Sequence, residues 1–143
     1  MIKEVIHMKK KSLTILIFIG VACLLISCAG ANFIPEGSQS LGVYEGSFSS
    51  DMYQGSLRVH LFQTPEGDKL FEANFLRDIT NPTVRKAYFV RGKMTANSLE
   101  GEMQGDFSGT LTGKLSQDGN RLTGSYNITT PDVDNGTWKV QKR

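Results

Sequence analysis

Few residues of this chain combine the types and spacing that catalysis requires. After residue 27 the only histidine is His60, which is flanked by the apolar Val59 and Leu61. In an extended segment this alternation predicts that the His60 side chain faces solvent. A nucleophilic triad needs its histidine in a cleft beside a nucleophile, and a zinc site would require more His or Cys residues than remain after residue 27. We therefore expect no catalytic residue, no metal and no cofactor.

Paired carboxylates are the remaining candidates for acid–base chemistry. Glu100 and Glu102 share one polar face, and Asp132 and Asp134 flank a predicted turn. A glycosidase needs two carboxyl groups that face each other across a cleft, whereas neighbours along one face are more simply a solvated surface. The segment 132–136 has the start of a calcium-binding loop without its distal Glu, so we interpret it as a turn. The sequence therefore predicts a protein that is not an enzyme.

The N-terminal segment has the pattern of an export signal. Lysines at 9–11 form a positive start, residues 13–26 are almost wholly apolar, and small residues follow. This order is typical of a secretory signal helix, and the apolar run is short for a membrane span. An uncleaved transmembrane anchor is the alternative, but no polar stop-transfer flank follows the run. Because Met8 directly precedes the lysines, translation starts either there or at Met1.

The end of this segment, Leu25-Ile26-Ser27-Cys28, resembles the lipobox of bacterial lipoproteins. The resemblance covers the leader alone, and its position directly after the apolar run makes it specific. It implies that Cys28 receives a diacylglyceryl group, that cleavage precedes Cys28 and that the new amine is acylated. Two or more acyl chains hold a protein stably on a membrane, whereas one does not. Ala29 after the cysteine implies, by resemblance to enteric lipoproteins, the periplasmic face of the outer membrane, with the inner membrane as the alternative.

Removal of the leader changes the charge of the chain. Of 16 Lys+Arg and 14 Asp+Glu, residues 1–27 hold four and one, so the mature part has a net charge of −1. The basic character therefore belongs to the leader, and nucleic acid is not expected as a partner. With Cys23 removed and Cys28 lipidated, no disulfide is expected. We predict a cleaved signal peptide over 1–27, a lipidated flexible tether over 28–41 and a β-barrel domain over 42–143.

Apolar and polar residues alternate with a period of two from residue 42 onward, which is typical of half-buried strands. The pattern is clearest over 99–115, where odd positions are apolar or glycine and even positions are polar. Eight strands with short connections favour an all-β, antiparallel up-and-down meander closed into a barrel, and a two-sheet β-sandwich is the alternative. The predicted strands are 42–49, 55–63, 69–77, 85–94, 98–104, 106–116, 121–129 and 136–142.

Hairpin registers follow from keeping apolar residues opposite apolar residues, because a slip of one residue reverses the faces. Asp118-Gly119 predicts a tight two-residue turn, and the segments 64–68 and around Gly105 predict loops with an odd number of residues. The pairs that these turns predict include Leu111 with Tyr126, Leu57 with Phe75, and Leu99 with Leu111.

The predicted interior is apolar and aromatic. An eight-stranded barrel is either filled by side chains or holds one small ligand, and both remain open at this point. If a small apolar ligand binds inside, the sequence predicts that its site is lined by Phe71, Phe75, Tyr88 and Trp138.

The glycine-rich hairpins and the Gly136-Thr137-Trp138 unit resemble those of avidin-like and lipocalin-like barrels. Those families carry Gly-x-Trp on the first strand, whereas here it lies on the last predicted strand. The resemblance therefore implies the fold alone, and no ligand-binding residue is carried over.

One stretch of the predicted outer wall is basic. Arg85, Phe89, Arg91 and Lys93 point outward on one predicted strand. This stretch is either a solvated wall or a patch that contacts anionic headgroups or an acidic partner. The sequence thus leaves two functions for a membrane-anchored envelope lipoprotein. It binds a small apolar ligand inside the barrel, or it is an interaction or inhibitor module that acts on another envelope protein through its outer surface.

Overall fold

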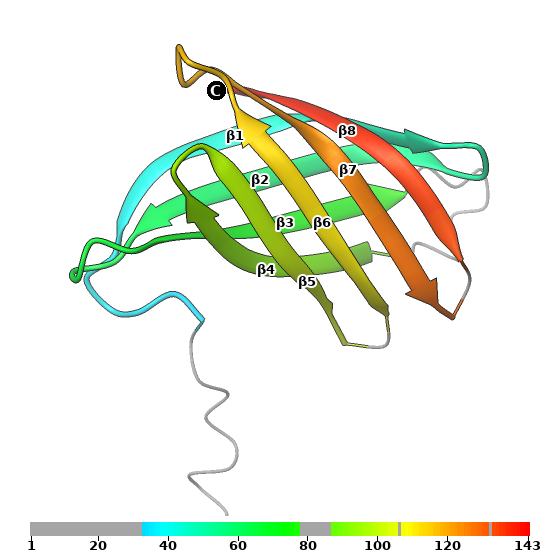
Figure 1. Ribbon diagram of the computed structural model, residues 1–143, viewed down its shortest axis with the longest axis horizontal. Coiled ribbons are helices and arrows are strands. Elements are labelled where there is room, and N and C mark those ends of the chain that lie inside the picture. The colour runs from blue at the N-terminus through cyan, green and yellow to red at the C-terminus, as the bar shows by residue number, and fades with distance from the viewer. Residues whose placement is uncertain (1–32, 78–86, 106, 132) are drawn as a thin grey trace, which may run out of the picture. The chain divides into compact units, whose positions relative to one another are not determined.

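The computed structural model describes residues 33–77, 87–105, 107–131 and 133–143, which form eight strands in one sheet (Figure 1). No helix among these residues is long and apolar enough to cross a bilayer. The strands are β1 (Gln39–Ser50), β2 (Gln54–Gln63), β3 (Lys69–Arg77), β4 (Ala87–Thr95), β5 (Ser98–Gln104), β6 (Ser108–Leu115), β7 (Arg121–Thr130) and β8 (Asp134–Lys142).

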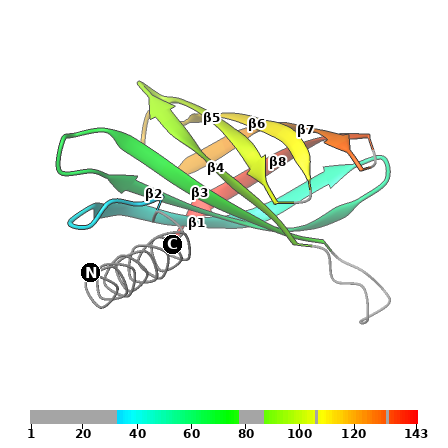
Figure 2. The same cartoon turned by 90° about the horizontal axis from the view of Figure 1, so that it is seen from below.

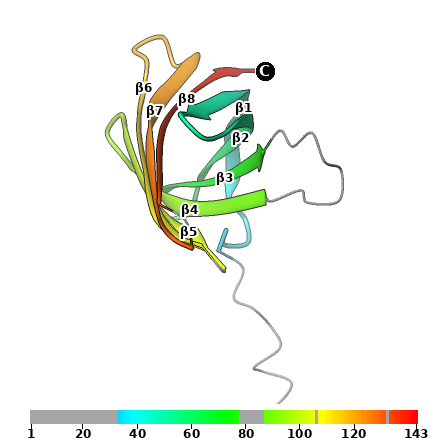
Figure 3. The same ribbon diagram turned by 90° about the vertical axis from the view of Figure 1, so that its right-hand side faces the viewer.

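Each strand pairs antiparallel with the next one in the chain, and β8 pairs antiparallel with β1, so the sheet closes into a barrel. Viewed from the side in Figure 3, β5 to β8 curve around one side of the interior and β1 to β4 around the other. Figure 2 shows the same strands crossing obliquely, as the tilt of a closed barrel requires. The predicted up-and-down barrel is confirmed, and the two-sheet sandwich is excluded.

The observed registers confirm most of the predicted hairpins and correct one. Leu57 lies opposite Phe75 and Leu111 lies opposite Tyr126, as predicted. The pairing of Leu99 with Leu111 is wrong, because Leu99 lies opposite Gly113 and Leu111 lies opposite Gly101. A slip of two residues keeps every side chain on its face, so alternation alone cannot detect it. In the observed register each of these leucines faces a glycine, which leaves room for its side chain.

The first strand begins three residues earlier than alternation predicts. β1 starts at Gln39, and its pairing with β2 shifts between Ser40 and Gly42. Such a bulge changes the parity of inward and outward positions, so the residues before it do not continue the pattern that follows. The compact unit that contains the barrel spans residues 34–143.

The register gives the barrel a stagger of eight residues. Paired residues followed from Gly42 on β1 through β2 to β8 lead back to β1 at Ser50. Eight strands with a shear of eight form a barrel whose interior is filled by layers of side chains. The stagger therefore predicts a packed core in this protein.

Aromatic side chains fill much of the interior. The rings of Phe48, Phe75 and Tyr126 pack edge to face, with centroids 5.0, 5.4 and 5.8 Å apart. Tyr88 packs edge to face on Phe107, with centroids 4.4 Å apart. The large apolar residues that parity predicts to point inward are buried, except Phe107 and Leu115, which are partly exposed. The buried hydrophobic core comprises Tyr44, Phe48, Leu57, Val59, Leu61, Phe71, Ala73, Phe75, Tyr88, Val90, Met94, Leu99, Met103, Leu111, Leu122, Tyr126, Ile128, Trp138 and Val140.

Candidate functional site

The four residues predicted to line an interior ligand site are all buried, and two of them, Phe75 on β3 and Tyr88 on β4, lie opposite each other. Phe75 lies in the aromatic cluster with Phe48 and Tyr126, whereas Tyr88 contacts Phe107. The Phe71 ring lies against the backbone of β4 and β5 at two glycines, Gly92 and Gly101. These contacts occupy the space that a ligand would need at these positions.

Trp138, the fourth of these residues, lies across two glycines of the neighbouring strands. A Cβ atom on Gly113 would lie 2.6 Å from Cη2 of its ring, and a Cβ atom on Gly124 would lie 2.7 Å from Cζ2. The indole N–H donates to the backbone oxygens of Thr112, at 3.1 Å, and Ser125, at 3.2 Å. The one polar atom of this side chain is thus bonded to the barrel wall.

The predicted surface patch lies on the outer wall of β4, and acidic residues surround it. Arg91 forms an ion pair with Glu72 of β3, with 3.3 Å between Nε and Oε1, and its guanidinium lies 4.8 Å from the Phe89 ring. On the other side, Glu102 lies opposite Arg91 and Glu100 lies opposite Lys93. Arg85 lies outside the described residues. The described part of this patch is therefore a wall of mixed charge.

A polar cluster, which we call the Arg77 mouth, closes the end of the barrel where β1 and β3 finish and β4 and β8 begin. The buried Asp134, only 5% exposed, accepts hydrogen bonds at Oδ2 from the Tyr126 hydroxyl and from Ser50 Oγ, both at 3.1 Å. Burial raises the pKa of Tyr126 to about 12, and the neighbouring Asp134 contributes to the rise. The Arg77 mouth consists of Ser50, Tyr53, Arg77, Tyr88, Tyr126 and Asp134.

Arg77 lies between two tyrosines of this mouth. Its Cζ atom is 3.0 Å from the centroid of the Tyr53 ring, a close cation–π contact. Burial raises the pKa of the Tyr88 hydroxyl, and the nearby Arg77 guanidinium acts in the opposite direction. Among the described residues, no carboxylate forms an ion pair with Arg77. The guanidinium is thus held against aromatic side chains, in the same mouth as the carboxylate of Asp134.

Exposed apolar side chains lie at the same end of the barrel. Met52 in the β1–β2 connection is 53% exposed, Leu76 near the end of β3 is 42% exposed and Val133 before β8 is 67% exposed. They are the large hydrophobic residues that the described surface leaves exposed. Apolar groups beside oriented polar groups are typical of a contact surface.

The mouth corrects the prediction that Asp134 flanks a solvated turn. Asp134 is the first residue of β8, and its side chain points inward with those of Trp138 and Val140. Arg77 has the same parity as Phe71 and Phe75, so the inward face of β3 ends in a charged residue, whereas the sequence predicted an apolar and aromatic interior. Parity could have identified both residues. The sequence instead predicted a turn at Asp134, before the predicted strand 136–142, and did not predict an interior position for Arg77, the last residue of the predicted strand 69–77.

His60 lies on the outer wall, as predicted. Its Nε2 atom is 2.7 Å from Ser40 Oγ, and its ring lies on that of Phe62, with centroids 3.9 Å apart. Burial and Arg58 lower the pKa of His60, and Glu72 opposes them. Within the described ranges, no group of three His, Cys, Asp or Glu side chains could hold a metal ion.

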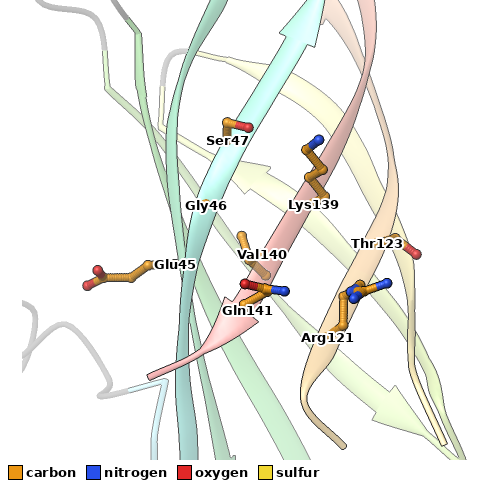
Figure 4. A pocket seen from close by; sticks show the side chains of 8 residues that line it. All are labelled: Glu45, Gly46, Ser47, Arg121, Thr123, Lys139, Val140 and Gln141. Atoms are coloured by element: carbon orange, nitrogen blue, oxygen red, sulfur yellow. The ribbon is translucent and has the colours of Figure 1, made fainter.

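A shallow groove runs along the outer wall of β7, β8 and β1. A hollow of about 480 Å³ lies between Glu45, Gly46 and Ser47 on β1, Arg121 and Thr123 on β7, and Lys139, Val140 and Gln141 on β8 (Figure 4). It shares Thr123 with a second hollow of about 400 Å³ and shares Arg121 and Gln141 with a third of about 350 Å³. Six of the eight residues that line it have polar or charged side chains.

Cys28 and the leader lie outside the described residues, so the predicted lipid attachment stays a prediction. Neither a known family model nor a curated protein sequence matches this chain.

Proposed function

We propose that this chain is a lipid-anchored protein of the bacterial envelope that binds another envelope protein through the Arg77 mouth. In this proposal Cys28 carries the lipid, the barrel is a rigid scaffold, and no reaction is catalysed. The observation that supports it most is the polar mouth itself, in a barrel whose remaining core is apolar.

The polar groups of the mouth are not needed to close a barrel. Burying Asp134 costs free energy that its hydrogen bonds only offset. An apolar side chain of similar volume would fill the same inward position. Departures of this kind from a consistent core are expected where a protein functions. This argument favours the Arg77 mouth over the outer wall of β4, where the cations lie beside carboxylates.

The chemistry of the mouth suits a protein partner that presents a carboxylate. Tyrosine and arginine are enriched at the centres of protein interfaces, where they contribute much of the binding energy. An arginine side chain binds a carboxylate with two parallel hydrogen bonds. Met52, Leu76 and Val133 add apolar contact area around the polar centre. A ligand inside the barrel is less favoured, because the aromatic rings pack on one another.

Site-specific cross-linking tests the partner-binding part of this proposal. A photoreactive amino acid replaces Met52 or Val133 at the mouth, and in the matched control it replaces Glu66, an exposed residue in the β2–β3 connection at the other end. We expect both mouth positions to give an adduct of one defined mass in cells, and Arg77→Gln to abolish it. Adducts from Glu66 alone, or adducts that Arg77→Gln leaves unchanged, would contradict the proposal.

The anchor is tested separately. Mass spectrometry of the detergent-extracted protein is expected to give the mass of residues 28–143 plus acyl chains. Cys28→Ser is expected to remove the lipid and release the protein from the membrane fraction. A native protein of unmodified mass would refute the anchor without bearing on the partner.

A further inference from the structure

Charge is distributed unevenly around the outer wall of the barrel. On the side formed by β6, β7, β8 and β1, the described anions at the surface are Glu45, Asp51 and Asp118, and the described cations outnumber them. The cations gather toward the end of the barrel where β8 finishes. We call this set of residues the basic wall, and it consists of Lys114, Arg121, Lys139, Lys142 and Arg143.

The strand register holds the first three of these cations around one residue, Thr123. Lys114 of β6 and Lys139 of β8 lie directly opposite Thr123 on its two sides, and Arg121 precedes it by two residues on the same face of β7. Neighbouring strands are separated by about 4.8 Å, so the two lysines project from backbone positions about 10 Å apart. Figure 4 shows Arg121 and Lys139 beside the hollow in this wall.

The carboxylates of this side neutralise only part of the wall. Glu45 forms ion pairs with Arg143, at 2.6 Å, and with Arg58, at 3.7 Å. Asp118 accepts hydrogen bonds from Ser116 and from the Asn120 backbone within its own turn, and the nearby Arg121 charge helps these bonds to lower the pKa of its carboxyl. None of the described carboxylates forms an ion pair with Lys114, Arg121 or Lys139. All three side chains are exposed.

The basic wall lies toward the end of the barrel at which the chain enters. β1 begins at Gln39, where β2 ends, and β8 ends there at Lys142, opposite Tyr44. A lipid on Cys28 would hold this end, rather than the Arg77 mouth, by a tether of about ten residues. The cations would therefore stay within reach of the headgroups of the bilayer that holds the anchor.

We propose that the basic wall rests on the anionic phospholipid headgroups of that bilayer, an inference that rests on the lipid anchor proposed above. A broad, shallow set of exposed cations suits a surface of many phosphates better than one enclosed phosphate. Each Lys or Arg near an anionic bilayer strengthens binding about fivefold. The contact orients the barrel with its side against the membrane and leaves the Arg77 mouth free to bind a partner.

Fluorescence quenching tests this contact in the lipidated protein. A fluorophore is attached at Ser47→Cys, beside the basic wall, or at Asn74→Cys, an exposed outward position on β3. Vesicles contain phosphatidylcholine alone, or an equal mixture with phosphatidylglycerol, and a nitroxide-labelled headgroup as quencher. We expect phosphatidylglycerol to increase quenching at position 47 but not at position 74. High salt should reverse the increase, because it screens exposed charges.

Matched charge variants identify the residues responsible. Arg121→Gln with Lys139→Gln should remove the increase at position 47, whereas Lys69→Gln with Lys93→Gln, which removes the same charge elsewhere, should leave it unchanged. Equal quenching in both kinds of vesicle, or equal loss in both variants, would overturn the docking. Binding of free phosphate without any effect of phosphatidylglycerol would also overturn it.

The anchor and the basic wall can fail independently. Flotation with phosphatidylcholine vesicles reports the anchor, because these vesicles carry no net charge. If the protein does not float with them, the anchor is refuted. If the protein then floats with vesicles that contain phosphatidylglycerol, the contact between the basic wall and the membrane is supported. If it does not float with these vesicles either, that contact is refuted as well.

Discussion

The Tyr126 hydroxyl on β7 donates a 3.1 Å hydrogen bond to Oδ2 of Asp134, the first residue of β8. Ser50, at the end of β1, donates to the same oxygen at 3.1 Å. One buried carboxylate therefore joins the side chains of three consecutive strands where the last strand of the barrel meets the first. The bonds are local to the Arg77 mouth, so this end of the seam is held by a polar contact in addition to the apolar core.

Replacing Asp134 by alanine is expected to destabilise the fold by about 1–3 kcal/mol, because the buried Tyr126 hydroxyl loses its acceptor. The half-buried Ser50 hydroxyl keeps the Tyr53 backbone oxygen as an acceptor at 3.3 Å. Asp134→Asn keeps an acceptor oxygen and should cost less. Urea unfolding measures both, with the exposed Asn135→Ala as the control on the same strand, expected within about 0.5 kcal/mol of the native protein. An Asp134→Ala protein as stable as the control would contradict the role given to this carboxylate.

The raised pKa of Tyr126 predicts a loss of stability at alkaline pH. Burial is the main cause of the rise to about 12, Asp134 adds to it, and a hydrogen bond with Ser50 opposes it. The unfolded chain, with a tyrosine pKa near 10, releases this proton first as the pH rises. The stabilisation is therefore complete below about pH 10 and is lost as the pH rises toward 12.

Unfolding free energies measured between pH 8 and 12 test this dependence. The unfolding free energy of the Tyr126→Phe protein should decline less steeply above pH 10 than that of the native protein. Part of the decline should remain, because burial also raises the pKa values of Tyr44 and Tyr88. If the two proteins lose unfolding free energy in parallel as the pH rises, Tyr126 is not the cause of the alkaline loss of stability.

Alternation in the sequence predicted the eight strands and the inward residues, because a half-buried strand must keep one face apolar along its length. Alternation gave wrong or incomplete predictions at positions where this need for one apolar face does not decide the structure. The register of β5 and β6 differs by two residues, a change that keeps both faces intact. The bulge between Ser40 and Gly42 hid the start of β1. Arg77 and Asp134 have the parity of the inward residues on their strands. Because both are charged and lie at strand ends, the apolar pattern did not identify them as inward.

The sequence could not predict whether the barrel is filled or hollow, and the reason is a different one. Eight strands allow both, and the stagger that separates them depends on the register of every pair. A two-residue difference in one hairpin changes that stagger without changing any inward or outward assignment. The pattern of apolar residues therefore predicts the lining of the barrel but not its width.

The contact between Trp138 and Gly113 predicts a strong coupling between these positions. A Cβ atom at position 113 would meet the Trp138 ring and the Thr123 backbone oxygen. Overpacking of this kind typically costs about 1–3 kcal/mol, so Gly113→Ala should be destabilising. Trp138→Phe shortens the ring system, so Gly113→Ala should cost less in that background. A double-mutant cycle by urea unfolding measures the difference, and additive effects would contradict the contact.

Gly67→Ala is a useful comparison for this cycle. No atom lies within 4 Å of the Cβ position at Gly67, but its φ of +95° favours glycine. Its replacement should therefore cost about 1–3 kcal/mol through backbone strain alone. Because this strain does not involve the Trp138 ring, the cost of Gly67→Ala should be equal in the native and Trp138→Phe backgrounds. A cost that changed with residue 138 would indicate a general loss of core packing instead.

The packed core also predicts how the barrel responds when one ring is removed. Phe75 is 1% exposed and contacts Phe48 and Tyr126, so Phe75→Ala should destabilise the protein by about 3–5 kcal/mol. An empty apolar cavity of this origin binds xenon or benzene. We therefore expect xenon to bind inside the Phe75→Ala barrel and not inside the native one, as detected by chemical shifts of the surrounding methyl groups. Binding of xenon among Phe71, Phe75 and Trp138 in the native protein would mean that the interior is hollow. An apolar ligand inside the barrel would then be the better proposal for its function.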